Sequence, residues 1–399
     1  MRYSFYKLSF IFVLALYLLS GCEEQNPINP IPTQNNNTNH YIVVLKTAGN
    51  GIQSVEAARN DVLAFAGNYN ISEADMGHLY NAVLKGFSAD LTAEQVNKMS
   101  KDPQVAFVEQ DQLMYIVGQP VVEDNNPKTI LAQTEPWGIT RVGGPSTATA
   151  FARAWIVDTG INLTHPDLNV NTALSRTFVK KGQDKNTAND LNGHGSHVSG
   201  TIAAKNNTAG VIGVAPNAQV IAVKVLNLQG SGYVSDIVAG LNYVYANATN
   251  GDVVNCSWGG GISSAIETAI SQFATRNDGS GPYVSIAIAA GNSSANAANS
   301  SPARVNGTGI YTVSAFGSGD VFASFSNWGN PPIDFSGPGV SVYSTYKNGG
   351  YATLSGTSMA TPHIAGIILA REAAGLTGIA TNGYVISDPD GNADPIAHE

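Results

Sequence analysis

The segment at 356–366, Gly-Thr-Ser-Met-Ala-Thr-Pro-His-Ile-Ala-Gly, constrains the fold of this chain more than any other segment. Its small first residues allow a sharp backbone turn, and the apolar, alanine-rich run after them predicts a buried helix. Ser358 would lie near the helix N-terminus, where free N–H groups and the helix dipole favour negative charge. Pro362 is tolerated there, because it removes only the helical bond to the Ser358 carbonyl. The segment is either a plain helix start packed on a sheet or the site of a nucleophile, which needs a base and an orienting acid.

Two upstream segments supply a candidate acid and a candidate base. The apolar run at 154–160 predicts a buried strand that ends in Asp158, and catalytic groups collect at such strand ends in open α/β sheets. In the segment at 192–201, His194 stands between two glycines and opens a predicted helix. His197 follows at a spacing that would allow a metal site, but the sequence places no third ligand beside the pair. We therefore expect His197 to be a packed structural histidine.

The three segments contain Asp158, His194 and Ser358 in this order and resemble the catalytic motifs of subtilisin-type (subtilase) serine proteases. Their amino-acid sequences are most similar to those of the proteinase K branch. The resemblance implies a secreted endopeptidase that acts on proteins and peptides through an acyl-enzyme. His194 would be the general base for Ser358, and Asp158 would orient its ring. By the same resemblance Asn292, in Ala-Ala-Gly-Asn after a predicted strand, would donate its side-chain N–H to the oxyanion.

The resemblance also implies how a substrate is held. Two glycine-containing segments match those that flank a bound peptide as edge strands, and without the triad they would read as ordinary loops. A third segment would help line the pocket for the residue before the scissile bond. We see no carboxylate in these segments, so we expect a broad apolar or aromatic preference. The residues concerned are Gly230, Ser231 and Gly232; Ser257, Trp258 and Gly259; and Ala290 and Gly291.

A structural calcium ion is expected at 203–216, which closely resembles the calcium-binding loop of subtilisins. Calcium prefers six or more oxygen ligands. The alternative is a loop held by its own hydrogen bonds. The resemblance gives these ligands: the Asn207 side chain, the carbonyls of Lys205, Ala209 and Val211, and Gln133 and Asp167. It also suggests a second site at Asp334, with carbonyls near Thr308 and Ile310.

The fold class follows from alternating strands and helices. Apolar strands are predicted at 154–157, 220–225, 253–256 and 283–290, with helices at 234–248 and 263–276 between them. This order predicts a doubly wound, mostly parallel α/β sheet with helices on both faces. The tail at 377–399 is rich in Gly, Asn and Asp, with one possible strand at 384–386, so the terminal helix packing of relatives is in doubt.

The amino-acid composition argues against several classes of binding partner. The net charge is −9 and only 12% of residues are charged, without a basic block, which argues against nucleic acid and against a polybasic membrane patch. The two cysteines, Cys22 and Cys256, exclude a disulfide framework, and we expect Cys256 to pack as a small apolar residue. We expect a monomer.

A separate domain is predicted at 40–117, in front of the peptidase domain at 132–399. Strand and helix signals follow one another as β-α-β-β-α-β, with strands near 40–46, 80–91 (broken at Gly86) and 104–109 and a capping box at Thr92. This small α+β, ferredoxin-like pattern resembles the inhibitor-type (I9) propeptide of subtilases, which would inhibit the enzyme and assist its folding. The alternative is an unrelated interaction domain of the same topology.

The remaining segments concern export and activation. Residues 1–22 read as a signal peptide ending in Leu-Ser-Gly-Cys, which resembles a bacterial lipobox with Cys22 as the lipidated residue; the alternative is an ordinary secretory signal. Residues 23–39 read as a disordered linker. Residues 118–131 form an exposed activation linker, and we expect self-cleavage near Leu131–Ala132. Only the precursor, a cell-envelope lipoprotein, would then be anchored in a membrane, and the mature enzyme would be extracellular.

Two other function classes remain. The chain could be a non-catalytic, subtilase-like binding or chaperone protein, although the intact Asp158, His194, Ser358 and Asn292 argue against this. It could also be an esterase on another α/β fold, but that fold orders its triad Ser, Asp, His.

Overall fold

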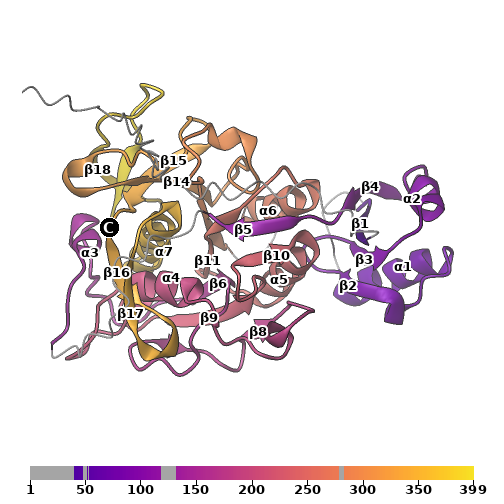
Figure 1. The fold of residues 1–399 in the computed structure, drawn as a ribbon, viewed down its shortest axis with the longest axis horizontal. Coiled ribbons are helices and arrows are strands. Elements are labelled where there is room, and N and C mark those ends of the chain that lie inside the picture. Colours follow the sequence, from indigo (N-terminus) through magenta and orange to yellow (C-terminus); the bar gives the residue numbers. More distant parts are fainter. Residues whose placement is uncertain (1–39, 48–51, 53, 118–131, 278–282) are drawn as a thin grey trace, which may run out of the picture. The chain divides into compact units, whose positions relative to one another are not determined.

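The computed structural model of the chain describes residues 40–47, 52, 54–117, 132–277 and 283–399. The N-terminal part of this range is a four-stranded antiparallel sheet in the order β2-β3-β1-β4, with two helices packed on it (Figure 1). The predicted capping box is present, because Thr92 and Gln95 bond to each other's backbone N–H. The elements are β1 (His40–Leu45), α1 (Val55–Gly67), β2 (Met76–Tyr80), β3 (Gly86–Asp90), α2 (Ala93–Met99) and β4 (Val105–Gln110).

The prediction of a strand over 80–91 is wrong between Tyr80 and Gly86. The backbone N–H groups of Asn81, Ala82 and Val83 all donate to the side-chain oxygen of Asn242 on α5 (Val234–Asn247). These N–H groups therefore bond across to the larger domain and form a turn in place of a strand ladder. This acceptor lies about 160 residues away in the chain, so no local pattern could indicate it.

The larger domain is built on a mostly parallel sheet, as predicted. Within the described residues this sheet has ten strands, in the order β18-β19-β15-β14-β13-β11-β6-β9-β7, with β8 beside β9. All of its pairings are parallel except that of β18 with β19. Its strands are β6 (Ala154–Asp158), β7 (Asn169–Val170), β8 (Arg176–Thr177), β9 (Gln219–Lys224), β11 (Val253–Cys256), β13 (Ser285–Ala289), β14 (Ile310–Phe316), β15 (Ile333–Pro338), β18 (Ala380–Tyr384) and β19 (Pro395–His398).

Helices cover both faces of this sheet because its strands are buried on both sides. Along β6, Trp155 and Val157 belong to the apolar cluster that contains α5 and α6 (Ser264–Thr275). The alternate residues Ala154 and Ile156 belong to the cluster with α4 (His194–Ala203) and α7 (Thr357–Ala373). Side chains that alternate in direction along a strand thus join two separate cores.

Shorter elements complete the domain. The tail forms β18 and β19 in place of a terminal helix, and β19 runs parallel to β15. The strand predicted at 384–386 lies earlier in the chain, at β18. In the described part of the chain, no helix combines the length and the apolar character needed to cross a membrane. The remaining elements are β5 (Leu113–Ile116), α3 (Trp137–Arg141), β10 (Ser231–Tyr233), β12 (Trp258–Gly259), β16 (Val342–Thr345) and β17 (Tyr351–Leu354).

Two buried histidines make stability depend on pH. His197 on α4 contacts the carbonyls of Val342 and Ala352 through Nε2, and burial lowers its pKa to about 3. Burial also lowers the pKa of His363 on α7 to about 4. Both rings stay neutral in the folded chain but take up protons in the unfolded chain below pH 6.5, so unfolding is favoured as pH falls from 6.5 towards 4.

We predict that this loss reaches about 1.4 kcal/mol per pH unit for each histidine. Buried carboxyl groups with a raised pKa, such as Asp334, change stability in the opposite direction. The measurement is therefore a difference: urea unfolding of Ser358→Ala and of Ser358→Ala/His363→Gln between pH 7.5 and 4.5. The stability gap between the two should shrink steadily below pH 6.5. A gap that does not change with pH would contradict the prediction.

Candidate active site

The three candidate catalytic side chains lie where strands end and helices begin. Asp158 is the last residue of β6, His194 is the first residue of α4, and Ser358 is the second residue of α7. All three are at most 1% exposed. The two helices pack on each other in one apolar cluster, which brings their first turns to the same edge of the sheet.

Asp158 and His194 form a buried hydrogen-bonded pair. His194 Nδ1 lies 2.8 Å from one carboxylate oxygen of Asp158 and 3.0 Å from the other. The carboxylate also accepts the backbone N–H of Thr159 at 2.7 Å. Since a carboxylate only accepts, Nδ1 is the donor in this pair, and in the neutral ring Nε2 is then the nitrogen without a proton. Nε2 is buried and has no hydrogen-bond partner among the described residues.

Ser358 lies at a turn that requires glycine. Gly356 has φ of 155°, and a Cβ there would lie 2.9 Å from the Asn292 side-chain nitrogen. The Ser358 hydroxyl donates to the Ser257 carbonyl at 3.1 Å. It does not bond His194 Nε2, which has no partner among the described residues. The Ser358 hydroxyl is therefore bonded to the backbone of the residue that links β11 (Val253–Cys256) to β12 (Trp258–Gly259).

Asn292 follows β13 and is held by α7. Its side-chain oxygen accepts both the backbone N–H and the hydroxyl of Thr357, each at 2.8 Å. These two bonds fix the amide so that its N–H₂ group points away from α7. That group donates to the carbonyl oxygen of Val117. The amide thus bonds a backbone carbonyl that comes from the end of β5.

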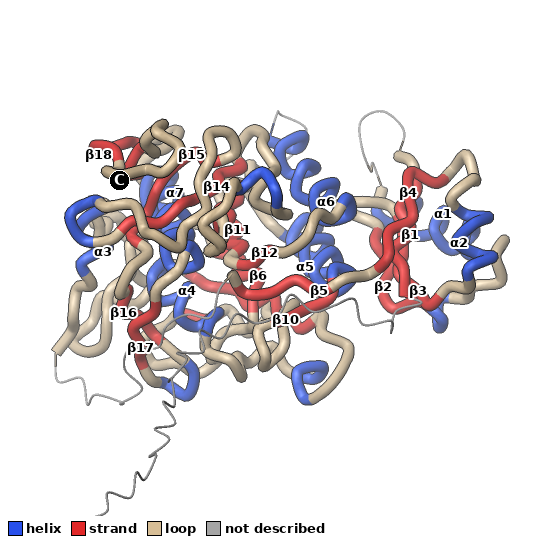
Figure 2. The backbone as a smooth tube through the Cα atoms, turned by 45° about the horizontal axis from the view of Figure 1, so that its top comes forward, coloured by secondary structure: helices blue, strands red, loops and turns tan. Residues whose placement is uncertain are grey.

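β5 is held as an extended strand between two neighbours (Figure 2). It pairs antiparallel with β10 and with β12, so that Tyr115 is opposite both Ser231 and Gly259. The Ile116 N–H donates to the Gly230 carbonyl at 2.8 Å. The two segments that the sequence predicts as edge strands therefore flank an extended segment, and here that segment belongs to the chain itself.

The side chains in these segments differ in what they do. Trp258 is fully buried, its indole N–H donates to the Val157 carbonyl, and its backbone pairs with Ile116 of β5. Ser257 is also fully buried. Ala290 and Gly291 are buried between the end of β13 and Asn292. Nothing in the described contacts assigns them a substrate.

Asp190 is a site residue that sequence reasoning missed. It is 1% exposed and accepts five hydrogen bonds: from the Thr159 hydroxyl, from the backbone N–H groups of Asn192, Gly193 and Ser196, and from the Ser196 hydroxyl. It thereby joins the end of β6 to the start of α4. A carboxylate four residues before a helix-opening histidine is a capping signal that could have indicated it.

Two carboxylates of the small domain cap helices of the large one. Glu109 accepts the Ala265 N–H at the start of α6, at 2.9 Å. Asp111 accepts the N–H and the hydroxyl of Ser235 at the start of α5, at 3.0 and 2.6 Å. Burial raises the pKa of Asp111 to about 6. Since helix N-termini favour negative charge, these contacts fix the small domain against α5 and α6.

The predicted calcium loop brings its residues together. The Gln133 side-chain amide lies 2.6 Å from the Lys205 carbonyl and 3.1 Å from the Val211 carbonyl. The Asp167 carboxylate, nearly buried, lies 2.7 Å from the Asn207 amide, and burial raises its pKa. Among the described residues no three His, Cys, Asp or Glu side chains form a metal cluster. A donor set of carbonyls and amides with one carboxylate nevertheless fits a hard cation such as Ca²⁺.

Other predicted residues are placed as follows. The Ala209 N–H bonds the Asn207 side chain, within the same loop. Asp334 accepts the Thr312 N–H, and the second metal site, with the carbonyls near Thr308 and Ile310, stays a prediction. Cys256 is buried, which raises its pKa. Cys22, the linker at 23–39 and the activation linker lie outside the described residues.

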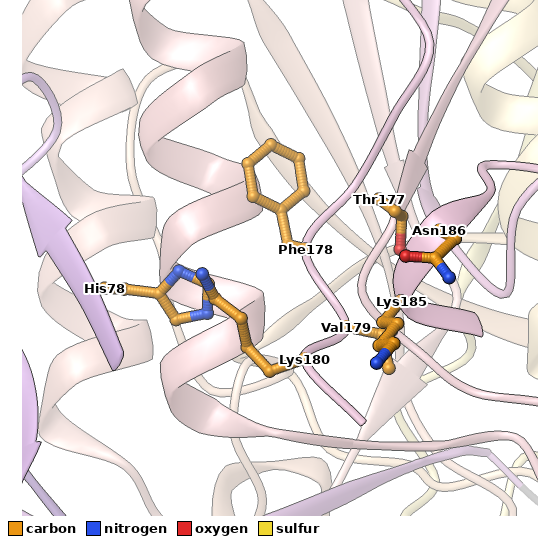
Figure 3. Close-up of a pocket in the computed structure, with 7 residues that line it drawn as sticks. All are labelled: His78, Thr177, Phe178, Val179, Lys180, Lys185 and Asn186. Atoms are coloured by element: carbon orange, nitrogen blue, oxygen red, sulfur yellow. The ribbon is translucent and has the colours of Figure 1, made fainter. Parts of the chain in front are cut away.

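A cavity of about 560 Å³ lies away from these groups (Figure 3). One lining residue, His78, comes from the small domain and lies 2.7 Å from Asp236 of α5. The rest come from the segments around β8, and none of the candidate catalytic residues lines it. The residues are His78, Thr177, Phe178, Val179, Lys180, Lys185 and Asn186.

Both the small N-terminal domain and the larger domain match known protein families. Residues 155–374 match the subtilase family of peptidases, and residues 40–116 match the peptidase inhibitor I9 family. The second match confirms that the N-terminal domain is of the inhibitor-propeptide type.

Individual proteins that are similar to this chain are serine proteases as well. Alkaline serine exoprotease A of Vibrio alginolyticus is 36% identical over 82% of this chain, which spans 59% of that protein's length. Proteinase R of Parengyodontium album is 34% identical over 82% of this chain and 77% of its own length. The crystal structure of a cold-adapted subtilisin-like serine proteinase is similar with a TM-score of 0.55 and 35% identity, covering 66% of this chain and 97% of that one. These matches, together with the doubly wound sheet, show that the chain belongs to the subtilase family of serine proteases, with an I9 inhibitor propeptide at its N-terminal side.

Proposed function

We propose that this chain is an exported endopeptidase that cleaves its own precursor first and other proteins afterwards, through Ser358, His194 and Asp158. One observation carries the proposal: the chain lays β5 between β10 and β12, with the Val117 carbonyl bonded to the Asn292 amide. A protease must hold its substrate extended, and strand addition does this with backbone hydrogen bonds alone.

The Ser358 hydroxyl is the nucleophile in this proposal. It turns from the Ser257 carbonyl to His194 Nε2, which has no other partner among the described residues. As Ser358 Oγ bonds to the carbonyl carbon, its proton passes to Nε2. The C–N bond then breaks and the same proton goes to the leaving amine, which leaves an acyl-enzyme. Water attacks the acyl group by the same route and restores the hydroxyl.

Two further groups stabilise the charges that develop. Asp158 holds the Nδ1 proton of His194 and so stabilises the imidazolium without being protonated itself. Asn292 donates to the oxygen that becomes the oxyanion, and the N-terminal end of α7 adds its backbone N–H groups and dipole.

The same contacts support a position for the first self-cleavage. The residue whose carbonyl is bonded by the oxyanion donor is the residue before the scissile bond, which here is Val117. Met114, Tyr115, Ile116 and Val117 would then represent the apolar sequence preferred on the acyl side. The expected cleavage near Leu131–Ala132 would be a later, second cut.

We also propose a calcium ion at the loop around Asp167 and a lipid on Cys22. The ion would be held by Gln133, Asp167, Asn207 and the carbonyls of Lys205, Ala209 and Val211, and it would supply rigidity only. The Leu-Ser-Gly-Cys signal supports lipidation of the exported precursor. Cleavage would separate that lipid from the peptidase domain, which we expect to act as an extracellular monomer.

We predict that Ser358→Ala abolishes hydrolysis of a fluorogenic peptide, by about 10⁶-fold, the loss known for the corresponding change in subtilisin, a member of this family. Asn292→Ala should lower kcat by about 100- to 1,000-fold with little change in KM, since its bond strengthens as the oxyanion forms; this range also comes from subtilisin. Asn299→Ala, an exposed residue at the end of the short 3-10 helix Ala297–Asn299, serves as the control and should keep wild-type activity. Undiminished activity of Ser358→Ala would exclude a serine mechanism at this residue.

We predict that the first new N-terminus of the maturing wild-type chain follows Val117. Intact mass and N-terminal sequencing over time would detect it, and Gly118→Pro should delay it, because a proline nitrogen after the scissile carbonyl makes a poor fit for strand pairing and attack. Leu131→Asp is the matched control and should leave the first cut unchanged. Should the earliest product begin at Ala132, the assignment to Val117 is wrong.

We predict that chelation destabilises the peptidase domain. A site filled at 100 to 1,000 times its Kd contributes about 2.7–4.1 kcal/mol. Removing the ion at matched ionic strength should therefore lower the Tm by roughly 5–15 °C for a domain of this size. Asp167→Asn in the Ser358→Ala background should lose most of this calcium-dependent shift. An unchanged Tm with chelator would favour a loop held by its own hydrogen bonds.

A further inference from the structure

The Ser358 carbonyl is a helix carbonyl that has no helical donor. In α7 its partner would be the N–H of residue 362, but Pro362 has none. Ser358 is 1% exposed, so water does not replace the missing bond easily. A buried carbonyl without a donor is costly, and some other group is expected to satisfy it.

Ser257 supplies that donor. Its hydroxyl donates to the Ser358 carbonyl at 3.1 Å, and it comes from the link between β11 and β12. The Asn255 side-chain amide in turn donates to the Ser257 hydroxyl oxygen at 2.9 Å. Because this bond occupies the oxygen as acceptor, the hydroxyl proton is directed to Ser358. Asn255 and Ser257 are both fully buried.

The two serines contact each other twice. The Ser257 carbonyl accepts the Ser358 hydroxyl at 3.1 Å, while the Ser257 hydroxyl donates to the Ser358 carbonyl. One residue thus bonds both the reacting oxygen of Ser358 and its backbone. Among the described residues, the Ser257 hydroxyl bonds Asn255 and Ser358, and the pairing of this segment with β5 begins one residue later, at Trp258.

We propose that the Ser257 side chain, oriented by Asn255, is a positioning residue that fixes the backbone of Ser358 in place of the helical bond that Pro362 removes. This inference rests on the proposed role of Ser358 as nucleophile. Ser257 acts through Ser358 and not on the substrate. A small shift of a nucleophile lowers the rate strongly, whereas strand pairing at β10 and β12 is unaffected.

The test is a double-mutant cycle with Ser257→Ala and Pro362→Ala. Ser257→Ala leaves the Ser358 carbonyl without a donor and should lower kcat and the rate of sulfonylation by phenylmethylsulfonyl fluoride about tenfold each, with KM within about twofold. Pro362→Ala restores the N–H that α7 lacks. In the double variant, both rates should return to within about threefold of those of Pro362→Ala alone.

The return of both rates in the double variant would distinguish lost positioning of Ser358 from lost packing at Ser257. Pro362→Ala supplies a new N–H for the Ser358 carbonyl but does not refill the space that Ser257→Ala vacates. Ser285→Ala, a buried serine of the adjacent strand β13, is the matched control and should keep both rates. If a variant matures poorly, the first-order rate of its first self-cleavage gives the same comparison without a substrate. Wild-type rates in Ser257→Ala, a double variant as slow as Ser257→Ala, or a loss confined to KM would each overturn the inference. Failure of the sulfonyl group to label Ser358 in the wild type would instead refute the proposed nucleophile.

Discussion

The burial of a carboxylate and an imidazole side by side determines much of the surrounding structure. Asp158 and His194 have almost no exposed surface, so the carboxylate oxygens and His194 Nδ1 need partners within the protein. Thr159 supplies an N–H to Asp158, and its hydroxyl links to Asp190. Asp190 then satisfies the free N–H groups at the start of α4. The buried carboxylate and His194 Nδ1 are therefore held by a connected network of hydrogen bonds that reaches the start of α4, and such a network makes the site rigid.

Carboxylates of the propeptide also satisfy free N–H groups at helix N-termini of the peptidase domain. Its carboxylates Glu109 and Asp111 satisfy free N–H groups at the starts of α6 and α5. These helices begin next to β12 and β10, the two strands that hold β5. Capping two helices thus aims β5 into the gap between the strands. The contacts between the propeptide and the peptidase domain therefore include helix N-termini as well as strand pairing.

Local patterns predicted most of the fold, and long-range contacts account for the rest. β11 and α5 were predicted nearly to the residue, because buried strands and apolar helix faces repeat over a few positions. The order of Asp158, His194 and Ser358 was recognisable from their flanking residues, yet their meeting depends on strand order. Asp190 with Thr159, Asn242 with the turn at Asn81, and Ser257 with Ser358 pair residues from 31 to 161 positions apart. Each of these is a polar contact specified by packing, for which a single sequence carries no periodic signal.

The position of residues 133–134 bears on how maturation proceeds. In the uncut chain, Gln133 contacts the Lys205 and Val211 carbonyls and the Thr134 N–H donates to the Gly210 carbonyl, while Val117 is bonded to Asn292. Docking of residues 133–134 on the loop therefore does not require the bond after Val117 to be broken. The cleavage that we propose after Val117 would then free β5 from the rest of the chain, because the loop beside Asp167 is already assembled.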